Sequence, residues 1–475
     1  NQTSIEWGEC QLEYIIPVEC AKFPVPLDYT DESAGTLTLS LVRARAVKEP
    51  FKGSILINPG GPGMSGIEHM QGVADIMLEM TGGQHDVIAW DYRGTGVTLP
   101  TVCYTDIAEQ ITAGALLPPS LGGSDTALGT AWSVQKIYSQ RCAESLRDVG
   151  EFVGTAATAR DMFQIVDALG EDGLLRYWGL SYGTYLGQTA AAMFPDRIGA
   201  MVLDGVVNAP DYNAAWEFDN AEVGDVGIKQ FAKDCIEAGI QACALAKPNA
   251  TTASLTTTLY DLIETARYEP IAMGPNSTAD YITASKLYIS INNALRTAIV
   301  TAPSLALWID SILSNNYTTY SALVSKFSAP AGGSDNTLAI RCSDTIFRSE
   351  TVDGIRTRVD RLLDLSATSE GFIVGYLTCS QWPFEGKGRY EGDFKAKTKN
   401  PILFVGSPLD VRTPVVSAFN ASEGFEGSGV LQHNGFGHGV LFSPGRCAIE
   451  AVQKYFNDGT LPEEGTQCEQ DFGIF

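Results

Sequence analysis

Short apolar runs alternate with longer stretches of helical spacing through the first part of the chain. Compact apolar runs bounded by turn residues are typical of buried strands, and apolar positions that recur every three to four residues are typical of covering helices. The pattern predicts an edge strand over 36–42, buried strands over 53–57, 86–90, 174–178 and 198–203, and helices over 67–80, 156–169 and 184–194. This alternation indicates a mostly parallel sheet covered on both faces.

The pattern changes at about residue 211. From there to about residue 390 the apolar positions keep helical spacing, as in 255–266 and 286–300, and polar loops such as 329–337 separate them. Strands over 401–406 and 430–433 and a helix over 444–456 then restore the alternation. We therefore predict an α/β fold with a mostly parallel central sheet. Its core comprises residues 1–210 and 391–475, and a large, mainly helical lid is inserted at 211–390.

Composition and charge limit the partners. Hydrophobic residues make up 44% of the 475 positions, and no apolar run approaches the roughly 20 residues that a membrane-spanning helix needs. The formal net charge of -24 and the pI near 4.5 would repel nucleic acid and anionic membranes. We predict neither as a partner.

Cysteines and sequons favour secretion. The sequence begins at Asn1 rather than at methionine, so we expect that a targeting segment has been removed. There is no C-x-x-C, and none of the four histidines stands in a cluster with cysteines, which disfavours a metal site. Spacing leaves the connectivity of the ten cysteines open, and we predict disulfides between sequence-adjacent couples: Cys10 with Cys20, Cys103 with Cys142, Cys235 with Cys243, Cys342 with Cys379, and Cys447 with Cys468. Sequons that would carry N-linked glycans lie at Asn1, Asn249, Asn276, Asn316 and Asn420.

A candidate nucleophile lies between a predicted strand and a predicted helix. Residues 179–183 read Gly-Leu-Ser-Tyr-Gly, which matches G-x-S-x-G in the context of a nucleophile elbow. The flanking glycines allow a tight turn that holds the Ser181 hydroxyl above the sheet. The alternative is a glycine-rich turn with an ordinary surface serine.

A serine nucleophile needs a histidine base and a carboxylate to orient it. His438 lies in a glycine-rich loop just after a predicted strand, whereas His433 lies within that strand and is better explained as structural. Asp410 follows the strand over 401–406, and Asp204, at the end of the strand over 198–203, is its rival. A helix cap or a solvated loop acid is the other interpretation of Asp410.

The tetrahedral intermediate needs backbone N–H donors. Residues 58–63, Asn-Pro-Gly-Gly-Pro-Gly, follow a buried strand, and the glycines let the backbone approach a substrate. We assign the donors to Gly61 and to Tyr182, the residue after the nucleophile. A phosphate cradle is disfavoured because the loop has neither a Gly-Lys-Ser/Thr ending nor the G-x-G-x-x-G spacing.

Together these motifs resemble the tripeptidyl-aminopeptidase-like branch of the prolyl-aminopeptidase group of α/β-hydrolases, with the fungal secreted members most similar. The resemblance covers nearly the whole chain and implies an α/β-hydrolase fold. It also implies a triad of Ser181, Asp410 and His438 with Gly61 and Tyr182 as the oxyanion hole, and no cofactor. It rests on the motifs at 24–29, 58–63, 91–96, 179–183, 203–207, 410–414, 437–439 and 447–468.

The substrate is the open question. An aminopeptidase needs a carboxylate for the substrate ammonium, and Glu217 and its acidic neighbours at the lid entrance are candidates unless they are simply solvated. Trp216 and Trp382 are candidates to stack on an aromatic group, although aromatic residues at helical spacing are more often core.

We predict a secreted serine hydrolase that cleaves carboxylic esters, including aromatic hydroxycinnamate esters of the feruloyl or chlorogenate type, because an ester needs no ammonium site. The alternatives are an aminopeptidase that releases N-terminal tripeptides or proline, and a non-catalytic binding protein on a hydrolase scaffold. We expect the substrate, a small-molecule ester or a short peptide, to contact the lid and the loops after the core strands.

Overall fold

The computed structural model describes residues 4–274, 281–327, 334–366 and 369–475. Its main sheet has nine strands in the order β1-β2-β4-β3-β5-β6-β9-β10-β11. β2 is antiparallel to β1 and β4, and every other neighbouring pair is parallel. The strands are β1 (Glu19–Pro26), β2 (Thr36–Ala44), β3 (Ser54–Asn58), β4 (Asp86–Asp91), β5 (Leu175–Leu180), β6 (Ile198–Asp204), β9 (Leu403–Gly406), β10 (Gly429–Asn434) and β11 (Gln467–Glu469). The predicted mostly parallel sheet is confirmed.

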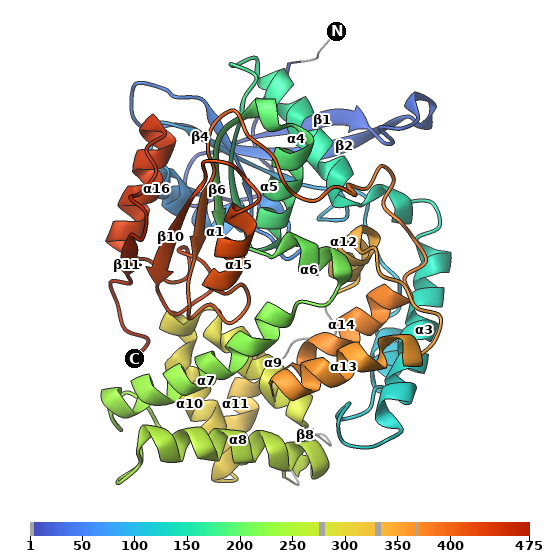
Figure 1. The fold of residues 1–475 in the computed structure, drawn as a ribbon, viewed down its shortest axis with the longest axis vertical. Coiled ribbons are helices and arrows are strands. Elements are labelled where there is room, and N and C mark those ends of the chain that lie inside the picture. Colours follow the sequence, from blue (N-terminus) through green and yellow to red (C-terminus); the bar gives the residue numbers. More distant parts are fainter. Residues whose placement is uncertain (1–3, 275–280, 328–333, 367–368) are drawn as a thin grey trace.

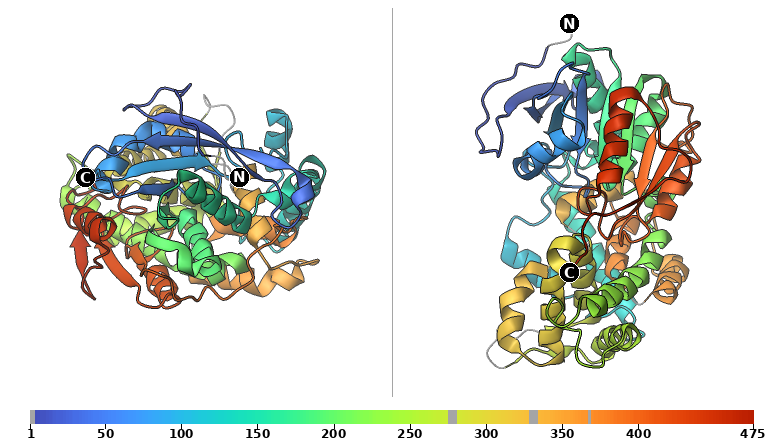
Figure 2. Two further views of the ribbon diagram at one scale, coloured as in Figure 1. Left: turned by 90° about the horizontal axis from the view of Figure 1, so that it is seen from above. Right: turned by 90° about the vertical axis from the view of Figure 1, so that its left-hand side faces the viewer.

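Helices cover both faces of this sheet, which explains why its central strands read as continuous apolar runs. One face packs against α1 (Gly66–Met80) and α16 (Arg446–Asp458). The other packs against α4 (Thr155–Leu169), α5 (Tyr182–Met193) and α15 (Val415–Ser422). Figures 1 and 2 show the sheet with these helices as one half of the molecule and further helices as the other half.

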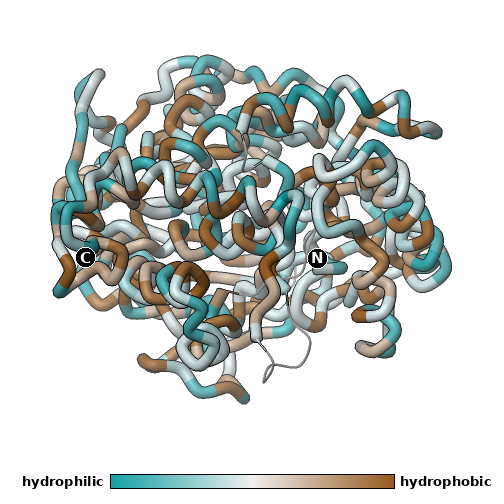
Figure 3. Tube along the Cα trace, turned by 90° about the horizontal axis from the view of Figure 1, so that it is seen from below, coloured by the Kyte–Doolittle hydropathy of each residue, from teal (hydrophilic) through white to brown (hydrophobic). Residues whose placement is uncertain are grey.

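The second half is built mainly from the chain between β6 and β9. In order it contains α6 (Ala209–Ala214), α7 (Phe218–Ala238), α8 (Thr252–Tyr268), the hairpin β7 (Ile271–Ala272) and β8 (Tyr281–Ile282), α9 (Ala284–Leu295), α10 (Ala298–Leu313), α11 (Tyr317–Phe327), α12 (Asp335–Asp344), α13 (Asp353–Leu365) and α14 (Glu370–Ser380). Its helical turns alternate hydrophilic and hydrophobic positions in Figure 3, the amphipathic pattern from which helices were predicted.

This half has two parts that pack differently. Helices α7 to α11 enclose a separate apolar cluster, whereas α12 to α14 share the apolar core of the sheet. The predicted core range 1–210 also contains α2 (Ile107–Gly114) and α3 (Ala127–Ser145). α3 lies against α14, where the Thr378 hydroxyl donates to Gln135 Oε1 at 2.7 Å. Two segments of the chain therefore build the helical half.

Two predicted elements differ from the structure. The predicted edge strand 36–42 is β2, and β1 lies outside it. β1 contains Pro24 and Pro26, which have no backbone N–H to donate and therefore suit an edge strand. The predicted helix 286–300 is two helices, because α9 ends at Leu295 and α10 begins at Ala298.

All five predicted disulfides are present. Of the predicted glycosylation sites, Asn249, Asn316 and Asn420 have exposed side chains, and Asn1 and Asn276 lie outside the described residues. Among the helices of the described segments, none combines the length and apolar content that crossing a bilayer requires.

Candidate active site

Ser181 occupies a strained turn between β5 and α5. Its φ of 55° and ψ of -122° lie where residues with a side chain rarely occur. The turn is tight because a Cβ at Gly183 would lie 2.7 Å from the Asn58 carbonyl oxygen, so only glycine fits there. The Ser181 residue remains partly exposed, as the predicted elbow requires.

His438 and Asp410 form a buried pair. His438 Nδ1 lies 2.9 Å from Asp410 Oδ2 and 3.0 Å from Oδ1. The backbone N–H groups of Arg412 and Thr413 donate to Asp410 Oδ1, and the Thr413 hydroxyl donates to Oδ2. Burial alone would raise the Asp410 pKa, but His438 and these donors outweigh burial and the pKa is lowered. Asp410 is therefore held as a carboxylate beside the histidine.

The break between α9 and α10 supports the histidine loop. The Arg296 carbonyl, which lies in that break, accepts a hydrogen bond from the His438 backbone N–H at 2.8 Å. The helical half thus holds the backbone of His438, whose side chain bonds Asp410 of the sheet half.

The rival acid Asp204 lies beneath the same loop without reaching the imidazole by a hydrogen bond. Its carboxylate accepts from the Val440 N–H at 3.0 and 3.2 Å. Burial raises the Asp204 pKa to about 7, and the nearby Asp410 adds to that rise. The structure therefore pairs His438 with Asp410.

Ser181 and the His438–Asp410 pair meet around residues 204–205. The Ser181 N–H donates to the Asp204 carbonyl at 3.0 Å. A Cβ at the next residue, Gly205, would lie 3.4 Å from Asp410 Oδ2 and 3.5 Å from His438 Cε1. The structure thus brings the three predicted residues to the same edge of the sheet.

The predicted oxyanion loop lies directly against the elbow. A Cβ at Gly60, whose φ is +89°, would lie 2.4 Å from the Leu180 carbonyl oxygen and 2.8 Å from Ser181 Cβ. Asn58 Oδ1 accepts from the Gly60 N–H at 2.9 Å. The buried Tyr92 hydroxyl donates to the Gly60 carbonyl at 2.9 Å and accepts from the Gly63 N–H at 2.7 Å. Tyr92 therefore fixes both ends of the turn that presents Gly61.

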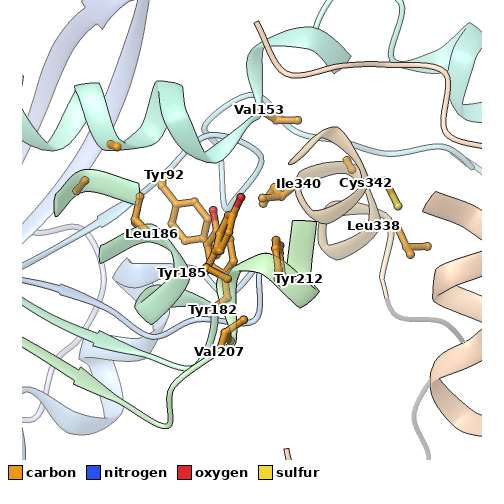
Figure 4. Close-up of a cluster of buried hydrophobic side chains, with 14 of the residues drawn as sticks. Tyr92, Val153, Tyr182, Tyr185, Leu186, Val207, Tyr212, Leu338, Ile340 and Cys342 are labelled. Atoms are coloured by element: carbon orange, nitrogen blue, oxygen red, sulfur yellow. The ribbon is translucent and has the colours of Figure 1, made fainter. Parts of the chain in front are cut away.

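Tyr182 is the first residue of α5, where N–H groups have no carbonyl partner within the helix. Its ring stacks on Tyr92 with centroids 5.8 Å apart, and Figure 4 shows both rings in a cluster with Tyr185 and Tyr212 that faces Ile340 of α12. The Tyr182 hydroxyl meets Thr155 Oγ1 at 2.5 Å, and Thr155 in turn donates to Asp344. Burial raises the Asp344 pKa to about 7.

A cavity of about 370 Å³ lies beside Gly61, between the sheet and the helical half. Two arginines, three aromatic residues and two asparagines contribute to its wall, and no aspartate or glutamate among the described residues lines it. These residues are Arg341, Arg412, Tyr288, Phe372, Tyr376, Asn292 and Asn293. The sequence did not predict this wall, because the wall combines α9, α12, α14 and two core loops. Only Gly61 and Arg412 of the lining lie in motifs noted in the sequence, 58–63 and 410–414.

The predicted substrate contacts need correction. Trp216 and Trp382 are 1% and 3% exposed and do not line the cavity. Trp216 packs against Tyr376, and Trp382 packs against Phe384. Both are core residues, and the prediction that they contact substrate is wrong. Helical spacing could not separate a core aromatic from one that lines a pocket.

Glu217 is buried at the start of α7 and forms a close ion pair with Arg341. Asn220 also donates to it, at 3.1 Å. Its neighbour Asp219 accepts from Asn208 and Ser417. Both carboxylates are therefore engaged within the protein.

The other histidines lie away from this site. His69, His85 and His433 are largely buried, and burial lowers the pKa of each, to about 4 for His69. His433 bonds the Ser443 carbonyl, in keeping with the predicted structural role. Within the described segments, no group of histidine, cysteine, aspartate and glutamate residues could hold a metal ion.

Comparisons with known proteins agree with this fold. Residues 53–227 match the alpha/beta hydrolase fold family, and residues 366–468 match the TAP-like protein family. The chain is 27% identical to serine protease Hip1 of Mycobacterium tuberculosis (strain ATCC 25618 / H37Rv), over 98% of this chain and 91% of that protein.

Two further relatives carry other names. Tripeptidyl aminopeptidase of Streptomyces lividans is 26% identical over 98% of this chain and 87% of its own. Carboxylesterase B of Mycobacterium tuberculosis (strain ATCC 25618 / H37Rv) is 26% identical over 97% and 89%. These names cover peptidases and an esterase, so they support a hydrolase and leave the cleaved bond to be argued from the site.

Proposed function

The chain belongs to the tripeptidyl-aminopeptidase-like branch of the α/β-hydrolases, and we propose that it is a secreted serine hydrolase. Within that class we propose that it cleaves carboxylic esters. The observation that carries the chemistry is the buried His438–Asp410 pair at the sheet edge that also holds the Ser181 elbow. Secretion is supported by the five disulfides, which persist in oxidising compartments.

In this proposal Ser181 Oγ attacks the acyl carbon while its proton passes to His438 Nε2. Asp410 holds the proton on Nδ1 and stabilises the imidazolium that forms. The N–H groups of Gly61 and Tyr182 donate to the oxyanion, which collapses as His438 protonates the leaving alcohol. A water, deprotonated by His438, then attacks the acyl-enzyme, releases the acid and restores Ser181.

The preference for an ester rests on the charges around the cavity. An aminopeptidase needs a carboxylate free to pair with the substrate ammonium. Glu217, the candidate from the sequence, is already paired with Arg341, and no described carboxylate lines the cavity beside Gly61. A cationic cavity wall would repel an ammonium group, whereas an ester needs none.

An aminopeptidase is the second candidate, and Glu370 favours it. This buried residue lines a neighbouring cavity of about 300 Å³ that shares Ile289 and Gly371 with the first. Its carboxylate accepts from Ser120, Ser285 and the Leu121 N–H. A peptide long enough to cross both cavities would bring its ammonium to Glu370.

Matched substrates decide between the two. The wild type, Ser181→Ala and Glu370→Gln would be assayed with an aromatic acyl ester, a tripeptide anilide and its N-acetylated form. We expect ester turnover that is lost in Ser181→Ala and retained in Glu370→Gln. Anilide turnover that disappears on acetylation and in Glu370→Gln would instead establish an aminopeptidase. A fluorophosphonate that fails to label Ser181 would contradict both.

A further inference from the structure

We propose that Arg412, with Arg341 beside it, binds a carboxylate of the substrate, so that the preferred esters are acidic and aromatic. This inference rests on the proposed function, because it names the substrate class of the same site. It extends that function by assigning specificity to residues that the catalytic steps do not use.

Arg412 is a cation with no ion-pair or hydrogen-bond partner for its guanidinium among the described residues. It lines the cavity and is partly buried. Its guanidinium carbon lies 4.8 Å from the centroid of the Phe372 ring. A guanidinium presents five donors in a planar fork, and leaving it unpaired in a partly buried site is costly.

Two other arginines of this chain, one buried and one partly buried, show what a structural role requires. Arg93 is paired with Asp161 at 2.7 Å and also donates to backbone carbonyls. Arg348 donates to five carbonyl groups. Arg412 has no such set, so its side chain is not needed to complete the protein's own hydrogen bonds.

Arg341 adds positive charge to the same wall. It lines the cavity, and its one carboxylate partner, Glu217, does not. Its Nε is buried without a hydrogen-bond partner, and its guanidinium lies over the ring of Tyr376 at 5.2 Å. The lining therefore presents Arg412 as an unpaired cation and Arg341 as a cation already paired with Glu217, and no carboxylate in the described residues lines the cavity beside them.

A carboxylate is the group that fits this wall. It can accept two parallel hydrogen bonds from one guanidinium, a strong and directional arrangement. Tyr288, Phe372 and Tyr376 line the same space, so the rest of the ligand would contact flat aromatic surface. A volume of about 370 Å³ suits a small aromatic acid ester rather than a long peptide.

The position of Arg412 places this carboxylate near the bond to be cleaved. Arg412 is two residues after Asp410 and donates its backbone N–H to that carboxylate at 2.9 Å. Gly61 also lines the cavity, and its neighbour Gly60 lies against Ser181. Ser181 itself does not line the cavity, so in this proposal a ligand held at Arg412 extends past Gly61 to the nucleophile.

The test uses pairs of aromatic acyl esters that differ only in one charge. In the first pair, the alcohol part of the ester carries a free carboxylate in one member and a carboxamide in the other. In the second pair, the acyl part carries the carboxylate or the carboxamide. We expect the wild type to favour the carboxylate member of at least one pair by about 30-fold or more in kcat/KM, mainly through KM. Arg412→Gln should reduce that preference about 30-fold, and Arg412→Lys should restore part of it.

Arg358→Gln is the matched control. Arg358 is also partly buried, lies over the Phe347 ring at 4.1 Å and has no carboxylate partner in the described segments, but it does not line the cavity. It should leave the charge preference unchanged. Equal rates on both members of both pairs in the wild type would overturn the inference.

Arg412 could instead act only through Asp410, and the same assay detects that. Both members of a pair would then slow equally in Arg412→Gln, and the pH profile would shift for both; this result overturns the inference while the ester hydrolase stands. Binding of the free aromatic acid to Ser181→Ala, followed by calorimetry with and without Arg412→Gln, gives a readout that needs no turnover. Binding that weakens with Arg412→Gln supports the inference even if esters prove not to be substrates, and unchanged binding contradicts it.

Discussion

Asp204 and Asp410 stand at the ends of neighbouring strands, and only Asp410 reaches His438. The difference lies in what else each carboxylate binds. Asp204 is engaged by the Val440 N–H, whereas the donors to Asp410 leave it open toward the imidazole. Two acids that the sequence leaves as rivals thus have separate roles: one holds the loop and the other faces the ring.

Asp410→Asn is expected to lower kcat by about 10⁴-fold, because an amide no longer fixes the proton on His438 Nδ1 or stabilises the imidazolium. Asp204→Asn should lower it less than about tenfold, since an amide oxygen still accepts from Val440. Steady-state kinetics with a neutral ester checks both, with circular dichroism to confirm folding. A larger loss for Asp204→Asn than for Asp410→Asn would reverse the assignment.

Single residues were predicted well where the chemistry demands a residue type in a fixed local context. Ser181 sits in a G-x-S-x-G turn, and His438 is one of only four histidines. Trp216 and Trp382 were misplaced because burial depends on which helices pack together, which local spacing does not encode. The proposed binding role of Arg412 was missed for the converse reason, since the lack of a partner among the described residues is visible only in three dimensions.

At the level of elements, the loop from β3 to α1 owes its shape to Tyr92. Tyr92→Phe removes the hydroxyl that joins the Gly60 carbonyl to the Gly63 N–H. We expect kcat to fall about tenfold with little change in KM, because Gly61 loses its fixed position toward the oxyanion. Stability should fall by about 1–3 kcal/mol, since two buried backbone groups lose their partner.

Tyr455→Phe is the control for this variant. The Tyr455 hydroxyl likewise accepts from a backbone N–H, of Met201, and donates to a carbonyl, of Pro401. Its loss should lower stability by a similar amount and leave kcat unchanged. Equal effects on kcat in the two variants would show that Tyr92 matters only for stability.

The Cys342–Cys379 disulfide joins two walls of the cavity. Cys342 follows Arg341 on α12, and Cys379 lies on α14, which also carries Tyr376. Replacing both cysteines by serine should cost about 3–4 kcal/mol of stability and raise KM severalfold as α12 and α14 lose their fixed spacing. Chemical denaturation and ester kinetics measure the two effects.

The Cys103–Cys142 disulfide provides the comparison. It closes a loop of 39 residues against 37 for Cys342–Cys379, so the expected loss of stability is nearly the same. Neither of its cysteines lies on a helix that lines the cavity beside Gly61. A rise in KM as large as that of the Cys342–Cys379 variant would show that the effect is general loosening.

Elements with a strong period were predicted to within a few residues, as for α1, α4 and α16. The errors lie where neighbours decide. β2 is interior because β1, the strand just before it in the chain, pairs with its outer side. The helix over 286–300 breaks where the Arg296 carbonyl accepts from the His438 N–H. Neither contact leaves a local signal in the apolar pattern.

At the scale of the whole molecule, two buried carboxylates hold separate segments together, and their contribution to the free energy of unfolding depends on pH. Asp204 holds the histidine loop, and Asp344 of α12 holds Thr155 at the start of α4. Burial raises the pKa of each to about 7 from an ordinary 3.8. The folded state therefore binds more protons than the unfolded state between about pH 4 and pH 7, and these groups contribute less stability as the pH rises through that window.

The buried histidines act in the opposite direction. Burial lowers the pKa of His69 to about 4 and lowers the pKa of His85 and His433, so the unfolded state takes up these protons first as the pH falls below 6.5. The two effects offset each other in the total stability of the wild type. The contribution of one carboxylate is therefore best measured as the difference between the wild type and a variant at each pH.

Asp344→Asn isolates that contribution. The amide can still accept from the Thr155 N–H and meet its hydroxyl, but it carries no charge to bury. Relative to the wild type, the variant should gain stability steadily from about pH 4 to pH 7 and then level off, by a total on the order of 4 kcal/mol. Urea unfolding at half-unit steps of pH measures the difference.

Asp28→Asn is the control, since the Asp28 pKa is lowered to about 2 by its hydrogen bonds to Thr30 and Lys387, which outweigh burial. The loss of stability in Asp28→Asn should be constant from pH 5 to pH 8. An equally constant difference between the wild type and Asp344→Asn would contradict the prediction. It would mean that Asp344 ionises in the folded state at little cost and that α12 packs on the core independently of pH.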